Sequence, residues 1–219
     1  MKTHRSPVTF RRLAAIGLVF CGAPLAAEHH APAAAAPEVS TSQEAVLAHL
    51  DRSRGLFLAA IDGLSVEQWR WKPAPDRWSV AECAEHITRT EVFLRELTRG
   101  VVSEPGTAEE LAASHGHAGT ILAMIVDRSQ RFQAPEPLNP MNQGELRTHA
   151  AIARDFSFER GRTYELAAAH ADLEALAKVH PAMQKPLDLA GWLYFLSGHV
   201  ERHTLQIEEV KATAGFPQS

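Results

Sequence analysis

Three histidines carry the strongest chemical signal in this sequence. His199 and His203 are four residues apart, so on an α-helix both imidazole rings leave the same face one turn apart. That spacing allows two rings to bind one metal ion. Both rings fall on the most apolar stripe of a C-terminal helical segment, where a neutral imidazole needs partners for its ring nitrogens. His86 lies on the apolar stripe of another helical segment and has the same requirement.

The pattern alone leaves two interpretations open, because the sequence contains twelve histidines and an i, i+4 pair also arises by chance. Either the three rings bind one metal, or each is an ordinary buried histidine bonded to backbone carbonyls. Three neutral ligands would leave the charge of a divalent ion uncompensated, so a bound water would ionise near pH 7. The site would then suit hydrolysis by that water, or transfer from a bound thiolate. Imidazole ligands admit Zn, Ni, Fe or Mn.

Few other side chains qualify as reactive groups. Cys83 lies about one helical turn before a histidine, but a small buried thiol is its expected state. Glu82 is interpreted as a helix cap and Glu201 is predicted to point away from the apolar stripe, so no general base stands out. His115 and His117 are expected to be solvent-exposed. The sequence has no nucleophile elbow, phosphate loop or dinucleotide fingerprint, and the catalytic group stays unassigned beyond a metal-bound water.

Four amphipathic helices are predicted to carry these residues. Apolar side chains recur at helical spacing over residues 41–62, 79–99, 144–170 and 188–213. A weaker helical stretch covers 106–131, and the proline-rich segment 134–140 is predicted to be a loop. Because no strand pattern separates the helices, we expect an all-α, antiparallel four-helix bundle with long connections.

Helix caps support these boundaries. Thr41 with Glu44, and Ser79 with Glu82, have the spacing of capping boxes. Asp188 is the expected N-cap of the last helix, after a turn marked by two proline residues.

Two stretches of the sequence are similar to the signature segments of a known family. Residues 78–86 have the pattern W-S-x-x-E-x-x-x-H, and residues 199–207 have the pattern H-x-x-R-H-x-x-Q-I. Together they resemble the DinB/YfiT-like metal-binding family, and the similarity extends over most of residues 41–213.

This resemblance implies a four-helix bundle that holds a divalent metal through one histidine of the second helix and two of the fourth. Here these are His86, His199 and His203. Arg202 and Gln206 also match the pattern, and we interpret them as hydrogen-bonding residues of the bundle that could orient the ligands. Related members include thiol-dependent transferases that use bacillithiol, mycothiol or glutathione, so a thiol-type transferase stands beside a hydrolase as an expectation.

The N-terminal segment is predicted to be a secretory signal peptide. Four basic residues precede an uncharged apolar run over 13–27, which is too short for a membrane span. We expect cleavage after Ala27, a linker over 28–40, the bundle over 41–213 and a tail over 214–219. A lipoprotein anchor at Cys21 is disfavoured, because Phe20 stands where that signal needs a small residue. The predicted location is therefore periplasmic or secreted.

Net charge and cysteine content limit the kinds of binding partner that this protein is expected to have. Loss of the four basic residues with the signal changes the formal net charge from −4 to −8, which gives no electrostatic footprint for nucleic acid. Cys83 is then alone, so no internal disulfide forms. We expect no stable membrane insertion after cleavage, a small-molecule substrate or ligand, and a homodimer as one option for assembly.

Three functions remain open at this point. The first is a metal-dependent enzyme, either a small-molecule hydrolase or a thiol-type transferase. The second is a metal- or ligand-binding protein of the cell envelope without turnover. The third is a bundle in which the histidines only pack.

Overall fold

The computed structural model describes residues 38–130, 132–142 and 146–218. The predicted signal peptide over 1–27 and most of the 28–40 linker lie outside the described residues, so they stay predictions. Among the described residues, none of the helices is both long enough and apolar enough to cross a bilayer.

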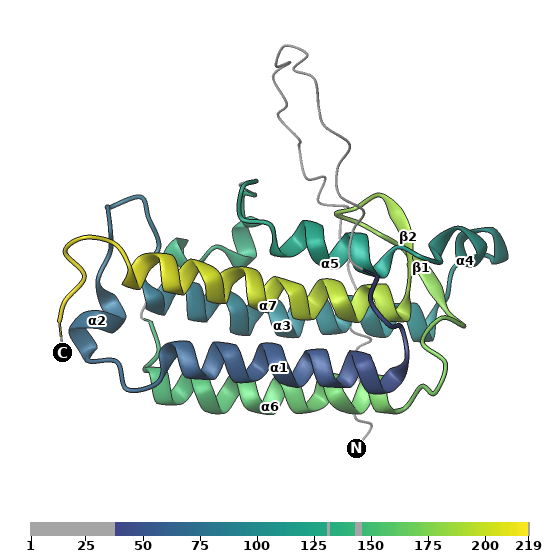
Figure 1. Ribbon diagram of the computed structural model, residues 1–219, viewed down its shortest axis with the longest axis horizontal. Coiled ribbons are helices and arrows are strands. Elements are labelled where there is room, and N and C mark those ends of the chain that lie inside the picture. The colour runs from purple at the N-terminus through teal and green to yellow at the C-terminus, as the bar shows by residue number, and fades with distance from the viewer. Residues whose placement is uncertain (1–37, 131, 143–145, 219) are drawn as a thin grey trace, which may run out of the picture.

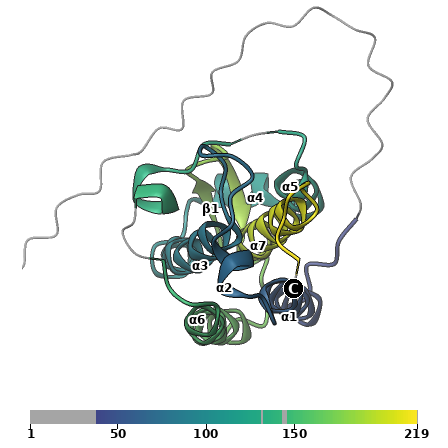
Figure 2. The same cartoon turned by 90° about the vertical axis from the view of Figure 1, so that its left-hand side faces the viewer.

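Four long helices form the body of the molecule: α1 (Gln43–Ile61), α3 (Val80–Ser103), α6 (His149–Ala168) and α7 (Leu189–Lys211). Helices α7 and α6 each pack against both α1 and α3, so the four surround a common interior, in which the buried apolar side chains form two clusters (Figure 2). In Figure 1, α1 and α7 run in one direction and α3 and α6 in the other. The all-α bundle predicted from helical periodicity is confirmed.

The long connections between these helices carry short elements of their own. They are α2 (Val66–Arg70), α4 (Ala108–Ser114), α5 (Ala118–Val126), the 3-10 turns η1 (Glu136–Leu138) and η2 (Pro140–Asn142), and the hairpin of β1 (Ala177–His180) with β2 (Lys185–Asp188). Helix α5 packs along α7 outside the bundle (Figure 1). The two touch closely at Gly198, where an added Cβ would lie 2.4 Å from Cγ2 of Ile125. Only a residue without a side chain allows that approach.

Several boundaries differ from the sequence-based expectation. The stretch 106–131 is two helices rather than one, because Gly116 has a φ of +78° and interrupts the helical path. Helix α3 does not end before Gly100 but continues to Ser103, since burial of Val101 in the core offsets the low helix propensity of glycine. The antiparallel β1–β2 hairpin was not expected, because Pro186 lies within one of its short strands.

The predicted caps are largely confirmed. Ser79 and Glu82 form a complete capping box at the start of α3, and the Asp188 side chain accepts a hydrogen bond from the Gly191 amide at the start of α7. At α1 the cap is Ser42 rather than Thr41, because the Ser42 hydroxyl accepts the Ala45 amide hydrogen.

A buried ion pair joins three of the four helices. Arg160 of α6 makes a bidentate contact with Glu91 of α3, at 2.9 and 2.8 Å, and both side chains are fully buried. Arg160 also donates to the Leu50 carbonyl and the Ser53 hydroxyl of α1, and Thr163 donates to Glu91. Each charged group is therefore hydrogen-bonded, which is the condition under which a buried pair is tolerated.

Removal of one partner of this ion pair is expected to destabilise the protein strongly. The variant Glu91→Gln leaves the Arg160 charge buried without a counter-charge, so the free energy of unfolding should fall by about 3–5 kcal/mol. Arg99→Gln is the matched control, because the Arg99–Glu96 pair is exposed and such pairs contribute less than about 1 kcal/mol. Urea unfolding measures both variants, and equal effects would contradict the buried role of Glu91.

His180 is a second polar group in the core. It is only 1% exposed, neither of its ring nitrogens has a hydrogen-bond partner among the described residues, and its ring lies 4.2 Å from those of Trp192 and Phe195. Burial lowers the pKa of His180 from 6.5 to about 4, because the apolar surroundings disfavour the imidazolium. The folded state therefore keeps this ring neutral.

This lowered pKa predicts a pH-dependent stability. The unfolded chain takes up protons below pH 6.5 while the folded chain does so only near pH 4, so stability is full above pH 6.5 and is lost as the pH falls toward 4. In chelator-treated protein, His180→Phe should reduce the slope of unfolding free energy against pH by up to about 1.4 kcal/mol per unit. His170→Gln serves as control, because the His170 ring lies just beyond α6 and bonds to the Leu166 carbonyl. Identical slopes for His180→Phe and wild type would show that His180 does not titrate in this way.

Candidate metal centre

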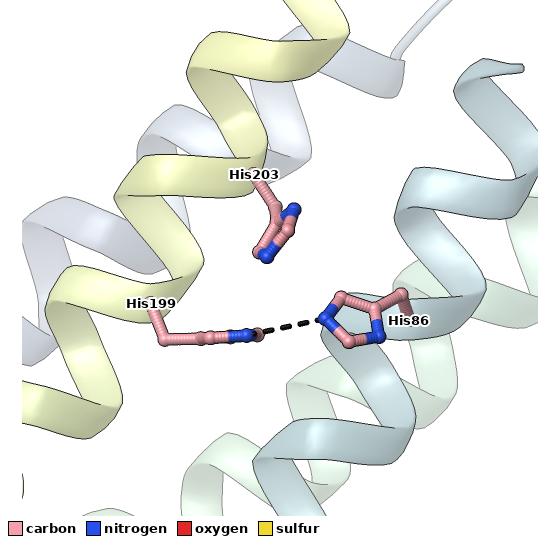
Figure 3. Close-up of side chains that lie close together, drawn as sticks. All are labelled: His86, His199 and His203. Carbon is pink, nitrogen blue, oxygen red and sulfur yellow. Dashed lines mark hydrogen bonds between the residues drawn. The ribbon is translucent and has the colours of Figure 1, made fainter. Parts of the chain in front are cut away.

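The three predicted histidines meet at the contact between α3 and α7. His86 projects from α3, and His199 and His203 project from successive turns of α7, with their rings directed toward one another (Figure 3). Each ring offers one nitrogen, and the three nitrogens lie within 4.8 Å of one another. His86 and His203 are buried, whereas His199 is half-buried.

Two of the rings are held by acceptors that define their proton positions. Nδ1 of His86 lies 2.9 Å from the Leu138 carbonyl oxygen, and Nδ1 of His203 lies 2.8 Å from Oε1 of Gln206. Because a carbonyl oxygen only accepts, both Nδ1 atoms must carry the proton. In the neutral rings the lone pair is then on Nε2, on the side that faces the cluster.

The spacing of the nitrogens fits a shared metal ion. The Nε2 atoms of His86 and His199 are 3.2 Å apart. Zinc–nitrogen bonds of about 2.0–2.1 Å in a tetrahedral arrangement place neighbouring ligand nitrogens about 3.3–3.4 Å apart. Ligands at this separation need little movement to bind one ion.

The electrostatic environment keeps the rings neutral. Burial lowers the pKa of His86 to about 4. Burial also lowers the pKa values of His199 and His203 well below 6.5, and the neighbouring rings add to this effect by mutual repulsion of their charged forms. At neutral pH all three rings are therefore free bases, the form that binds metal.

Comparison with known proteins identifies the family of this chain. The family profile described as DinB superfamily matches residues 49–207, which is most of the chain and includes all three histidines. The chain belongs to the DinB superfamily.

Two proteins of Bacillus subtilis are similar to this DinB chain. The uncharacterized protein YuaE of strain 168 is 26% identical over 155 residues, which cover 69% of this chain and 88% of YuaE. The solved structure of YfiT, described as a probable metal-dependent hydrolase with an unusual four-helix bundle topology, superposes with a TM-score of 0.55 at 13% identity. It covers 83% of this chain and 94% of YfiT. At that identity the second likeness supports the fold alone.

The two further residues of the DinB pattern have different places in the structure. Gln206 bonds directly to His203 and also lies 3.4 Å from the guanidinium of Arg128. Arg202 instead donates to the carbonyls of Ile125, Asp127 and Gln130, and its guanidinium covers the ring of Phe132 at 4.9 Å. Gln206 thus orients a ring of the cluster, whereas Arg202 fastens the end of α5 and the following loop to α7.

Two contacts at the cluster were not foreseen from the sequence. Trp78 is half-buried with its ring 4.9 Å from that of His86 and 5.9 Å from that of His203. Its position directly before the Ser79 cap was the available signal. The Leu138 carbonyl comes from the proline-rich loop, and a main-chain acceptor leaves no mark in a sequence.

The remaining candidates lie apart from the cluster. Cys83 is fully buried among apolar residues, and burial raises the pKa of its thiol far above the usual value, so it is an inert thiol as expected. Glu201 lies toward α1, where its carboxylate is 3.5 Å from His49.

The hydrogen bond from His203 to Gln206 should govern metal affinity. Gln206→Leu removes the acceptor that fixes the ring and its proton, so Zn²⁺ affinity at the three-histidine cluster is expected to fall about 10- to 100-fold. Gln206→Glu keeps an acceptor oxygen and should retain the affinity. Competition against a chromophoric chelator measures the Zn²⁺ affinity of both variants. The His199→Ala variant shows which bound ion belongs to the cluster, because its binding should be lost there. An unchanged affinity in Gln206→Leu would limit Gln206 to a role in packing.

Proposed function

We propose that this DinB protein binds one divalent metal ion through His86, His199 and His203 and acts as a metal-dependent hydrolase of small molecules. The observation that carries the proposal is the orientation of the rings. The Nδ1 protons of His86 and His203 are donated to fixed acceptors, the Nε2 atoms of His86 and His199 are 3.2 Å apart, and one nitrogen of each ring lies within 4.8 Å of the others.

The chemistry follows from the neutral ligand set. A divalent ion held by three imidazoles keeps its full charge and lowers the pKa of a bound water to near 7, which supplies a nucleophile at neutral pH. The Leu138 carbonyl and Gln206 hold the ligand rings in one tautomer. The Trp78 ring lies against those of His86 and His203, so a substrate would have to approach from the side of the half-buried His199.

Two considerations bear on the reaction type. The structural neighbour YfiT is described as a probable metal-dependent hydrolase, which favours hydrolysis. A thiol-type transferase would use the same ion to hold a thiolate, and it would depend on an added thiol. The metal identity is left among Zn, Ni, Fe and Mn, because an imidazole set does not choose between them.

A second function is favoured by the burial of the cluster. His86 is 3% exposed and His203 is 9% exposed, which leaves few directions of approach. A metal site this enclosed also suits a metal- or ligand-binding protein without turnover. Both functions require the same ligands and differ only in catalysis.

Metal content and turnover measured on the same samples separate these functions. Purified wild-type protein without an affinity tag should retain one more equivalent of metal than the His86→Ala/His203→Ala variant. His117→Ala is the matched control, because the His117 ring bonds to the Ala113 carbonyl at the end of α4 and lies outside the cluster. Initial rates on a panel of small esters and amides, with and without glutathione, then report the activity.

Each outcome is decisive for one part of the proposal. Metal-dependent rates that need no thiol and disappear in the double variant support the hydrolase. Rates that require glutathione favour the transferase. Retained metal without turnover on the panel favours the non-catalytic binder, and equal metal content in wild type and double variant would overturn the metal proposal.

A further inference from the structure

A second group of potential metal ligands lies at the N-terminal end of α7. Among the described residues, His115, Glu174 and Asp188 each offer one ligand atom, and these atoms lie within 4.8 Å of one another. They come from three separate places in the fold: the α4–α5 loop, the loop between α6 and β1, and the junction of β2 with α7. No two of them are near in sequence, so the tertiary fold alone brings them together.

One side-chain oxygen of Asp188 in this group is buried without a hydrogen-bond partner among the described residues. The residue is 1% exposed, and its Oδ1 accepts the Gly191 amide hydrogen at 2.7 Å. Its Oδ2 is buried and has no hydrogen-bond partner among the described residues. A buried carboxylate oxygen without a partner is rare, because the lost solvation is not replaced.

The start of α7 has no spare donor for this oxygen. The Leu189 amide donates to the Leu176 carbonyl and the Ala190 amide donates to the Leu173 carbonyl. The next amide, that of Gly191, is already used by Oδ1. The partner of Oδ2 must therefore come from outside the helix.

The charges in the group call for a cation. Burial raises the pKa of Asp188, and the nearby carboxylate of Glu174 raises it further. With both carboxylates ionised and the imidazole neutral, the group carries a charge of −2, which a divalent ion neutralises. Imidazole suits transition metals, whereas Ca²⁺ and Mg²⁺ prefer sites built from oxygen ligands alone.

We propose that His115, Glu174 and Asp188 form a second metal site, which binds a divalent transition-metal ion of the Zn²⁺ type. Glu174 and Gly116, the residue next to His115, also line a surface hollow of about 300 Å³. Asp188 precedes His199 by eleven residues, which is about 16 Å along the helix, so the site is separate from the three-histidine cluster. Its ion fastens two loops to the first turn of α7.

Zinc stoichiometry tests the second site directly. Full-length protein, freed of its affinity tag and stripped with chelator, is dialysed against Zn²⁺ at pH 7.5. The test variant is His115→Ala/Glu174→Gln, which leaves the Asp188 cap intact, and His117→Ala is the control on the other side of Gly116. The His86→Ala/His203→Ala variant is measured in parallel. Co²⁺ loading adds a spectroscopic readout, because nitrogen-rich and carboxylate-rich sites give different visible spectra.

Wild type and His117→Ala are expected to bind one equivalent more than His115→Ala/Glu174→Gln, and that equivalent should persist in His86→Ala/His203→Ala with the spectrum of a carboxylate-rich site. Equal binding by wild type and His115→Ala/Glu174→Gln would overturn the second site and leave Asp188 and Glu174 as a carboxyl pair that shares a proton. If the three-histidine proposal is wrong, His86→Ala/His203→Ala binds as much Zn²⁺ as wild type. This comparison does not involve His115→Ala/Glu174→Gln, so failure of one proposal can be told from failure of the other.

Discussion

The desolvation of three imidazole rings is the constraint on which the centre of this bundle depends. A ring nitrogen removed from water needs a partner, and a protonated ring in the core would be strongly unfavourable. The structure meets the first need with the Leu138 carbonyl and the Gln206 amide, and it meets the second by holding the rings neutral. What remains is a lone pair on Nε2 of His86 and another on Nε2 of His203, beside the ring of His199, and such nitrogens are the donors that a metal ion requires.

Such an arrangement needs helices that do not shift relative to one another. The Arg160–Glu91 network ties α6, α3 and α1 together through a buried contact with fixed geometry. Helix α7, which carries two of the three rings, packs against α1 and α3 on one side and α5 on the other. The ligand side chains therefore project from elements whose relative positions are set by packing and by directional hydrogen bonds, as a precise metal geometry demands.

Local rules predicted a large part of this structure. Helical periodicity located the four long helices, the Ser79 box and the Asp188 cap set two of their starts, and i, i+4 spacing brought His199 and His203 to one face. What could not be predicted depends on contacts between distant segments. The Leu138 acceptor, the stacking of Trp78 on the rings and the approach of His115 to Asp188 all arise where loops return to the bundle. The β1–β2 hairpin was not predicted, because its strands are short and one of them contains proline.

The close contact of α5 with Gly198 has a consequence for the neighbouring metal ligand. Any larger residue at this position would push α5 outward, since the available space is filled by Ile125 and Leu122. Arg202 fastens the end of α5 to α7, and the chain beyond it leads to the Leu138 carbonyl that binds the His86 proton. A larger residue at position 198, next to the ligand His199, would therefore displace the segment that leads to the Leu138 carbonyl. Because that carbonyl accepts the Nδ1 proton of His86, the substitution would affect the tautomer of the ligand on the facing helix.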